Sequence, residues 1–397
     1  MPGDPSSTLT TDAKGRESWW CTRCLPGPVG LRNGVEPRCN NESMAARPDK
    51  PVVDTPLYQA MIAGRVDYRP WAGQGLTDEE CFLCTATLIE GIRTVEDVFP
   101  RWLQRKIAQK KHKGVSIELP NLTYVQPERI KIPACKSCNG VYLSRIEKII
   151  SQAFPAGRDA VAALPEKILR AWFAKIAYGT RRNDMRLKDV RSDPHSPMIA
   201  READLEGLSF LHLLLQEARD VVSIPDGHST FFTFQSQHVG CSVCDFDVAL
   251  PIGWPHPVML RLGSVTVMGA VDDRGSLEDL RSHPAFVAAA TMSIHPIQVR
   301  ALWALLVHRA TLLRPENMPV RFGVSQRRLW VERLPPIADV VEPVHEQAFA
   351  DKLLRNLIQA TEEELAAHGG TTGLLVDANG QLRQMPFEHG LLRLGVK

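Results

Sequence analysis

The spacing of hydrophobic residues alternates between a helical and a strand-like period along this chain. Within residues 164–178, apolar side chains recur every three or four positions and predict an amphipathic helix with one buried face. From about residue 228 the apolar positions alternate and are rich in β-branched and aromatic residues, which predicts strands of one antiparallel sheet. These strands are predicted at residues 230–235, 245–250 and 258–267.

The rest of the second half returns to a helical period. Helices are predicted at residues 202–222, 298–313 and 346–367. Trp172, in the first helix, and His212 are expected to lie in the core. Short strands are predicted at residues 320–322, 328–331, 373–376, 382–385 and 391–394, with a hairpin turn at 377–380.

A different pattern marks residues 101–113, which carry six Lys or Arg and no acidic residue. Leu103 and Ile107 lie one helical turn apart, so we predict a basic helix with a narrow apolar stripe. A hairpin formed by residues 116–119 and 122–125 is predicted to follow.

These elements divide the chain into four segments. Residues 1–50 lack apolar periodicity and are expected to be a disordered extension, with Met44 as a plausible true start. Residues 51–155 form a cysteine-containing domain, residues 156–225 a helical segment and residues 226–397 an α+β domain with an antiparallel sheet. The predicted fold class of the whole chain is therefore α+β.

Composition narrows the class of protein without naming it. The chain has 397 residues, 44% hydrophobic and 23% charged, with a formal net charge of +2, as is ordinary for a soluble globular protein. No apolar run reaches the length of a membrane span, and no signal segment is recognised. Nine cysteines, four of them in metal-ligand spacing, favour a reducing cytoplasm over a secreted disulfide scaffold.

Two Cys-x-x-Cys pairs supply the strongest chemical signal in the sequence. Cys81 and Cys84 form the first pair, and Cys135 and Cys138 form the second. A two-residue gap lets a tight turn direct both sulfurs to one ion, and four thiolates suit tetrahedral Zn²⁺. Helical spacing begins directly after Cys138, so we predict a structural zinc site that pins the start of a helix.

The remaining cysteines leave open whether further metal sites exist. Cys241 and Cys244 form a third pair with His238 nearby, but a fourth ligand is not evident. The same holds for the cysteines of the N-terminal segment, Cys21, Cys24 and Cys39. Ordinary unligated cysteines are the favoured interpretation in both places.

The cysteine pairs and the segment between them together resemble the HNH endonuclease family. The resemblance rests on the two pairs, on Glu-Asp-Val-Phe-Pro-Arg-Trp-Leu at residues 96–103, and on Asn139, Ser144 and Glu147. It covers residues 78–152, under a quarter of the chain. It implies a zinc-stapled treble-clef ββα finger that cuts nucleic acid with one divalent ion.

The resemblance assigns a role to each matching residue. Glu96 falls on the family's metal-binding acid and Asn139 on its second metal ligand, while Asp97 stands where the family has its general-base His. An ionised Asp is too weak a base by several pKa units to replace a His near neutral pH. Three alternatives remain: Glu96 and Asp97 hold Mg²⁺ or Mn²⁺ and the ion generates hydroxide, His112 acts as the base, or the finger only binds.

Two function classes follow from the resemblance. The first is a metal-dependent nuclease, and the second is an inactive zinc module that binds nucleic acid or a protein partner within a larger defence or mobile-element assembly. In both, the basic helix is expected to contact phosphates, on DNA rather than RNA. The residues expected to make these contacts are Arg101, Arg105, Lys106, Lys110, Lys111 and Lys113.

Overall fold

The structure is a computed structural model of the chain. It describes residues 7–11, 17–21, 78–109, 117–121, 123–200, 208–237, 246–251, 253–325, 328–337, 346–358 and 360–383. The chain divides into two compact units, Met1–Arg47 and Pro48–Lys397. In the first unit, β1 (Ser7–Thr11) and β2 (Glu17–Cys21) pair as an antiparallel hairpin, a pairing that the sequence pattern did not predict.

The described part of the second unit begins with a small region that holds the four paired cysteines, residues 78–156, which we call the finger. Its centre is an antiparallel pair of strands, β3 (Arg93–Asp97) and β6 (Lys131–Cys135), which we call the finger hairpin. In this pair Glu96 lies opposite Ile132. Between these strands the chain forms α2 (Arg101–Gln109) and a short hairpin of β4 (Ile117–Glu118) and β5 (Tyr124–Val125). The predicted basic helix is thus confirmed over residues 101–109, while residues 110–113 lie outside the described part of the chain, and the predicted hairpin is confirmed in its described residues.

The strand β6 leads directly into helical backbone. A π-helical turn, η3 (Cys138–Leu143), begins at the last cysteine and continues into α3 (Ser144–Ala156). The helix ends at Gly157, whose positive φ of 104° reverses the chain into α4 (Arg158–Ala162).

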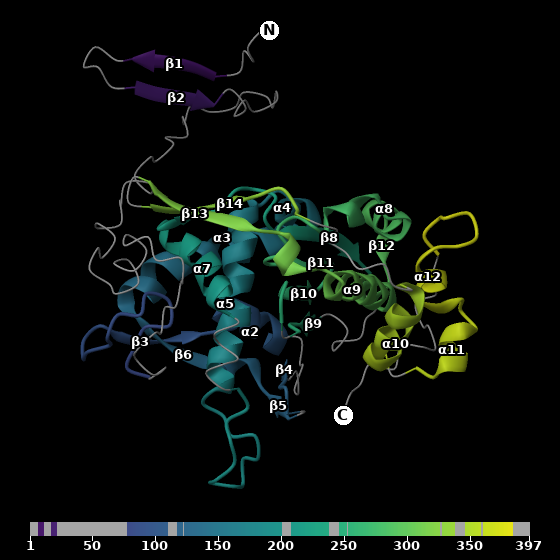
Figure 1. Cartoon of the computed structure of the whole chain (residues 1–397), viewed down its shortest axis with the longest axis horizontal. Helices are drawn as coiled ribbons and strands as arrows, with labels where there is room; N and C mark the ends of the chain where they lie inside the picture. The colour runs from purple at the N-terminus through teal and green to yellow at the C-terminus, as the bar shows by residue number, and fades with distance from the viewer. Residues whose placement is uncertain are drawn as a thin grey trace, which may run out of the picture. The chain divides into compact units, whose positions relative to one another are not determined.

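The long helix α5 (Glu166–Asp184) joins the finger to the rest of the unit (Figure 1). Trp172 is fully buried in it, as predicted, and stacks on Trp102 of α2 with ring centroids 6.2 Å apart. Gly179 faces the finger hairpin so closely that a Cβ there would lie 2.8 Å from Cγ2 of Val98 and 3.0 Å from Cδ1 of Ile132. Close approach of helix and hairpin therefore depends on this glycine.

The helix predicted at residues 202–222 is wrong at its C-terminal end, and its first residues, 202–207, lie outside the described part of the chain. The structure forms α7 (Ser209–Leu215), then a 3-10 turn η4 (Gln216–Arg219), and Val222 already belongs to strand β7 (Val222–Ser223). Asp220 adopts the left-handed conformation, with φ of 56°, which ends helical hydrogen bonding before residue 222. Apolar periodicity alone does not reveal such a stop.

The C-terminal half contains the predicted sheet, in the order β12–β8–β11–β10–β9. The pairings from β8 (Thr230–Ser236) through β11 (Val265–Ala270) and β10 (Pro257–Leu262) to β9 (Phe246–Ala249) are antiparallel, and only the edge strand β12 (Ser293–Ile294) runs parallel to its neighbour. The single strand predicted at 258–267 is wrong: Gly263, at φ of 62°, turns the chain there and makes two strands of it.

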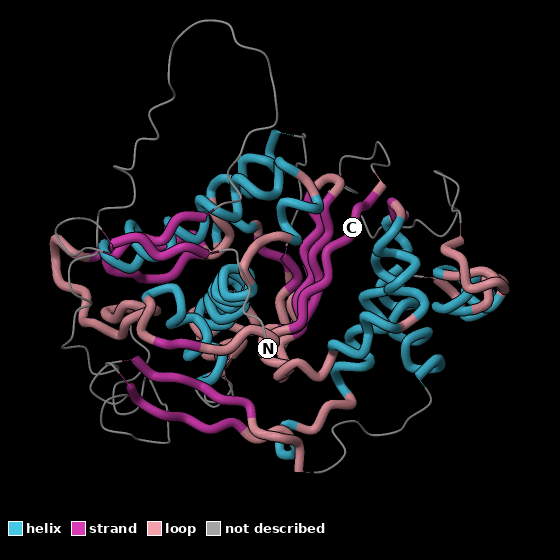
Figure 2. The backbone as a smooth tube through the Cα atoms, turned by 90° about the horizontal axis from the view of Figure 1, so that it is seen from above, coloured by secondary structure: helices cyan, strands magenta, loops and turns pink. Residues whose placement is uncertain are grey.

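Alternate residues of this sheet belong to two different hydrophobic cores. Phe231 and Leu260 pack with the finger and α5, whereas Phe232 and Met259 pack with the C-terminal helices. Helices accordingly flank the sheet on both sides (Figure 2). Phe231 stacks on Phe173 of α5 at 5.7 Å, so the finger side and the sheet share one continuous core.

The helices on the far side of the sheet are α8 (Pro284–Thr291), α9 (Pro296–Thr311), α10 (Glu346–Ile358), α11 (Glu362–Ala366) and α12 (Gly370–Leu375). The helix predicted at 298–313 is confirmed as α9. The single helix predicted at 346–367 is wrong, because Thr361 caps a new helix by accepting a hydrogen bond from the Glu364 backbone NH. The strand predicted at 373–376 is also wrong, since this segment ends α12.

Two further strands complete the described elements. The segments predicted as short strands at 320–322 and 328–331 form the hairpin of β13 (Val320–Ser325) and β14 (Arg328–Arg333), and β14 pairs in parallel with β7. The turn predicted at 377–380 is present, with Gly380 at φ of 74°. The strand predicted at 391–394 lies outside the described residues. The α+β class is confirmed, and no helix among the described residues is both long and apolar enough to cross a membrane.

Candidate metal centre and the surface beside it

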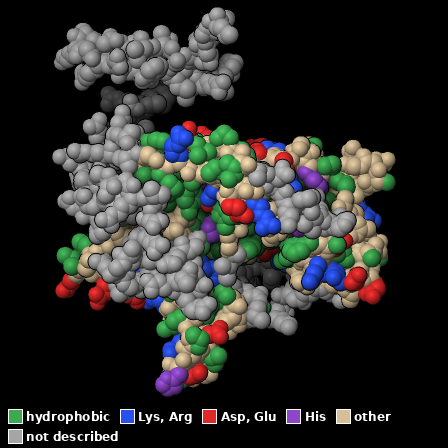
Figure 3. Space-filling view, viewed as in Figure 1, with side chains coloured by type: hydrophobic (Ala, Val, Ile, Leu, Met, Phe, Trp, Pro, Cys, Tyr) green, Lys and Arg blue, Asp and Glu red, His purple; other side chains and the backbone are tan. Residues whose placement is uncertain are grey.

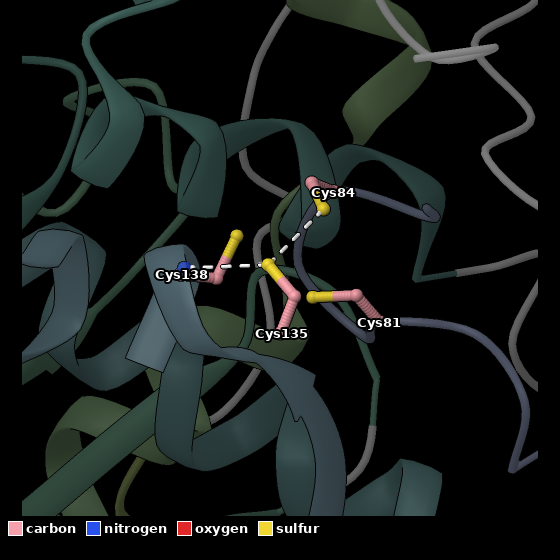
Figure 4. A group of neighbouring side chains, drawn as sticks. All are labelled: Cys81, Cys84, Cys135 and Cys138. Atoms are coloured by element: carbon pink, nitrogen blue, oxygen red, sulfur yellow. Dashed lines mark hydrogen bonds between the residues drawn. The ribbon is translucent and has the colours of Figure 1, made fainter. Parts of the chain in front are cut away.

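The four cysteines of the two Cys-x-x-Cys pairs meet at one point in the finger. Cys81, Cys84, Cys135 and Cys138 are all buried, and their sulfurs lie within 4.8 Å of one another. Figure 4 shows the four side chains converging from the turn at residues 81–84, which we call the first knuckle, from the end of β6 and from the start of η3. The prediction, made from ligand spacing, that these four cysteines lie together is confirmed.

The cluster has the dimensions of a tetrahedral thiolate site. Four sulfurs bound to Zn²⁺ at about 2.3 Å are separated by about 3.8 Å, and Sγ of Cys84 lies 3.8 Å from Sγ of Cys135. Hydrogen bonding between the thiols of Cys135 and Cys138 lowers the pKa of Cys135 and raises that of Cys138. Neighbouring thiolates repel each other, so all four ionise together only around a cation. The four cysteines could therefore hold a metal ion such as Zn²⁺.

Backbone hydrogen bonds hold the first knuckle against the hairpin. The Thr85 NH donates to the Cys81 carbonyl at 2.8 Å, and Thr85 adopts φ of 59° to close the turn. The Phe82 NH donates to the Pro133 carbonyl of β6 at 3.0 Å. The knuckle is thus fixed to the same strand that carries Cys135.

Two buried side chains of the helical segment also hold this knuckle. His212 Nε2–H donates to the Phe82 carbonyl at 2.9 Å, and Gln216 Nε2 donates to the Leu83 carbonyl at 2.8 Å. Burial lowers the pKa of His212 to about 3, so the ring is neutral and donates through one nitrogen. The prediction that His212 is a satisfied core histidine is confirmed.

Glu96 lies on the inner face of β3, where it is only 5% exposed. Its carboxylate is ion-paired with the ammonium of Lys175, a fully buried residue of α5. The same ammonium pairs with Glu147 of α3 and donates to the Asp97 backbone carbonyl at 2.9 Å. Burial of the carboxyl raises the pKa of Glu96 to about 7, against the opposing charge of Lys175. Burial disfavours the ammonium too, but the two carboxylates outweigh it and raise the pKa of Lys175.

Asp97 and Asn139, the other two residues assigned from the resemblance, engage different partners. The Asp97 carboxylate pairs with Arg101 at 2.9 Å and with Lys131 at 3.4 Å. Asn139 Nδ2 donates to Thr94 Oγ1 at 3.2 Å and to the Val95 carbonyl at 3.1 Å. Thr94 and Glu96 alternate to the same face of β3, so Asn139 and Glu96 lie on one side of the strand, while the Asp97 side chain turns to the other.

Basic side chains gather where Asp97 of β3 pairs with Lys131 of β6, and we call Arg101, Arg105, Lys106, Lys131 and Arg186 the basic surface. Arg101 and Lys131 flank the Asp97 carboxylate with side chains 77% and 48% exposed. Arg186 donates to the Lys131 carbonyl at 2.9 Å and pairs with the Asp78 carboxylate at 2.9 Å. Arg105 and Lys106 continue the exposed face of α2. On the face seen in Figure 3, basic and acidic side chains are interspersed.

Several predicted residues lie outside the described part of the chain. They are Lys110, Lys111, His112, Lys113, Cys24, Cys39, His238, Cys241 and Cys244, and of Cys21 only the backbone is described. The sequence pattern did not indicate Lys175 as a partner of Glu96, or Lys131 as a partner of Asp97. A lysine within the apolar face of residues 164–178 was the available signal for the first.

Comparisons of the chain with protein-family models, with curated proteins and with solved structures gave no match.

Proposed function

We propose that this protein is a zinc-stapled nucleic-acid-binding protein, whose HNH-like treble-clef finger contacts phosphates through the basic surface. The observation that supports this most is the pair of exposed cations, Arg101 and Lys131, on the Asp97 carboxylate, with Arg186 bonded to the Lys131 carbonyl next to them. Asp97 holds two of these cations side by side, which limits the side-chain entropy lost when they bind an anion.

The rigidity of the finger favours phosphate binding at this place. Arg101 and Lys131 project from α2 and β6, and β6 ends in the cysteine cluster. Zn²⁺ bound at the cluster would therefore keep the basic groups in register. Arginine forks suit the geometry of phosphate oxygens, and each phosphate contact displaces condensed counterions from the nucleic acid.

The proposal is tested by the salt dependence of binding to a short DNA duplex of random sequence. Arg101→Gln and Lys131→Gln are each expected to weaken binding and to reduce the slope of log K against log salt by about one. Lys167→Gln is the matched control, since Lys167 is exposed near the N-terminus of α5, about 26 Å along the helix axis from its C-terminus. Unchanged binding in the variant that combines Arg101→Gln with Lys131→Gln would refute the proposal. The same measurement with an RNA duplex shows which of the two nucleic acids binds more tightly.

The second candidate, a metal-dependent nuclease, is favoured by one observation: Asn139 and Glu96 lie on the same side of β3. In the same assay it predicts cleavage of the labelled duplex with Mg²⁺ or Mn²⁺, lost on Glu96→Gln. Such cleavage would replace the binding-only proposal, whereas intact duplex across both ions supports it.

A further inference from the structure

We infer that the Lys175 ammonium is a built-in cation that fills the position of a divalent metal beside Glu96. The inference rests on the proposed function in taking the finger as HNH-like. It adds that the finger holds nucleic acid without Mg²⁺ or Mn²⁺ at Glu96.

The surroundings of the ammonium are those of a cation site. Three oxygens converge on Nζ of Lys175: one carboxylate oxygen of Glu96, one of Glu147, and the Asp97 carbonyl oxygen at 2.9 Å. Two carboxylates and a carbonyl are also the hard oxygen ligands that Mg²⁺ and Mn²⁺ take. Strand β3 and helix α3 thus build an oxygen cage, and α5 supplies its occupant.

The ammonium and a divalent ion exclude each other in this cage. A Mg²⁺ ion needs ligand oxygens at about 2.0–2.1 Å, in the volume that Nζ now occupies. Lys175 is 1% exposed, so its ammonium is held inside the protein against these oxygens. The divalent ion implied by the resemblance therefore does not fit the residues that are present.

Charge balance supports the same conclusion. Without a cation, the buried carboxylate of Glu96 and the partly exposed carboxylate of Glu147 would repel each other, and Glu96 would hold an unpaired charge away from water, which is costly in a protein interior. The covalently tethered ammonium supplies that charge permanently, independent of metal supply. Glu96 then stabilises the contact between the finger and α5 and is not available as a metal ligand.

The test measures Mn²⁺ binding to the zinc-loaded full chain, without nucleic acid, by the loss of the free Mn²⁺ signal in electron paramagnetic resonance. The wild type is expected to show no Mn²⁺ site that depends on Glu96, so that Glu96→Gln leaves its Mn²⁺ binding unchanged. Lys175→Met is expected to gain one Mn²⁺ site at least tenfold tighter than any in the wild type. Lys175→Met with Glu147→Gln is the matched control, and it is expected to lose this gain.

Each outcome decides the inference. A Mn²⁺ site in the wild type that disappears in Glu96→Gln would overturn it, as would a folded Lys175→Met protein that gains no site. If Lys175→Met does not fold, the comparison of the wild type with Glu96→Gln decides alone. Failure here would leave the salt-dependent binding of the basic surface untouched, so the two proposals fail separately.

Discussion

At the scale of single residues, the burial of Glu96 has a consequence for pH dependence. Its pKa is raised from 4.5 to about 7, mainly by burial. Between these values the folded protein keeps a proton that the unfolded chain releases, so the free energy of unfolding falls as pH rises from about 4.5 to 7. The prediction is that this loss amounts to at most about 3 kcal/mol.

Urea unfolding of the zinc-loaded protein between pH 5.5 and 7.5 measures the effect, with Glu96→Gln as its control. The variant keeps the shape of the side chain and the pH dependence of the cysteines, so the difference between the two pH profiles isolates the carboxyl. Parallel profiles would contradict the assignment of the raised pKa to Glu96.

Some residues of the candidate site could be predicted from the sequence and others could not. The positions of Cys81, Cys84, Cys135 and Cys138 followed from ligand spacing, because Zn²⁺ coordination sets short, fixed intervals. The pairing of Glu96 with Lys175 could not be predicted in the same way. Lys175 lies 78 residues after Asp97, the residue next to Glu96, and an ion pair that forms by packing has no characteristic spacing in the sequence. Pairing across elements depends on the tertiary fold, which periodicity does not encode.

At the scale of elements, α7 and the turn η4 that follows it are expected to influence metal affinity from outside the ligand set. His212→Ala and Gln216→Ala each remove a donor to a carbonyl between Cys81 and Cys84. Loss of partners that orient a metal site typically costs 10- to 100-fold in affinity. We therefore expect Zn²⁺ to bind about 10-fold or more weakly in each variant, measured by competition with a chromogenic chelator.

A matched control is available within the finger. Gln104 donates through Nε2 to the Phe99 carbonyl at 2.7 Å, the same chemistry at a carbonyl outside the knuckle. Gln104→Ala is expected to leave Zn²⁺ affinity within about threefold of the wild type. Equal losses in all three variants would mean that the effect comes from general destabilisation of the fold.

Element boundaries were the part of the fold that sequence periodicity reached least well. Helices α5 and α9 were predicted because their apolar faces are long and unbroken. The break between α10 and α11 was missed, although Thr361 and Glu364 form a capping box that the sequence contains. The turn at Gly263 was missed because the flanking strands continue one alternating pattern.

At the scale of the whole second unit, the finger and the sheet are expected to unfold together. Phe231 of β8 stacks on Phe173 of α5 within a core that extends from the cysteine cluster to the sheet. Phe231→Ala is expected to lower the free energy of unfolding by about 3–5 kcal/mol. Hydrogen exchange is followed separately for amides of α3 and α9 at increasing urea concentration. The urea concentration at which protection is lost should fall by the same amount in both helices.

The exposed residue Val287 of α8 provides the comparison, because it is 49% exposed and its truncation is expected to change stability by under about 0.5 kcal/mol. Protection of α9 that survives after α3 has exchanged would contradict a single cooperative unit. It would mean that the two hydrophobic cores on either side of the sheet melt independently.

The glycine at position 179 bears on how this architecture tolerates change. It lies one helical turn after Lys175, on a stretch of α5 that touches the hairpin directly. A methyl group there would meet the side chains of Val98 and Ile132, which must shift to admit it. Any movement of α5 away from β3 would also carry Lys175 away from the oxygens it now reaches, so a substitution at this position bears on the ion pair as well as on packing.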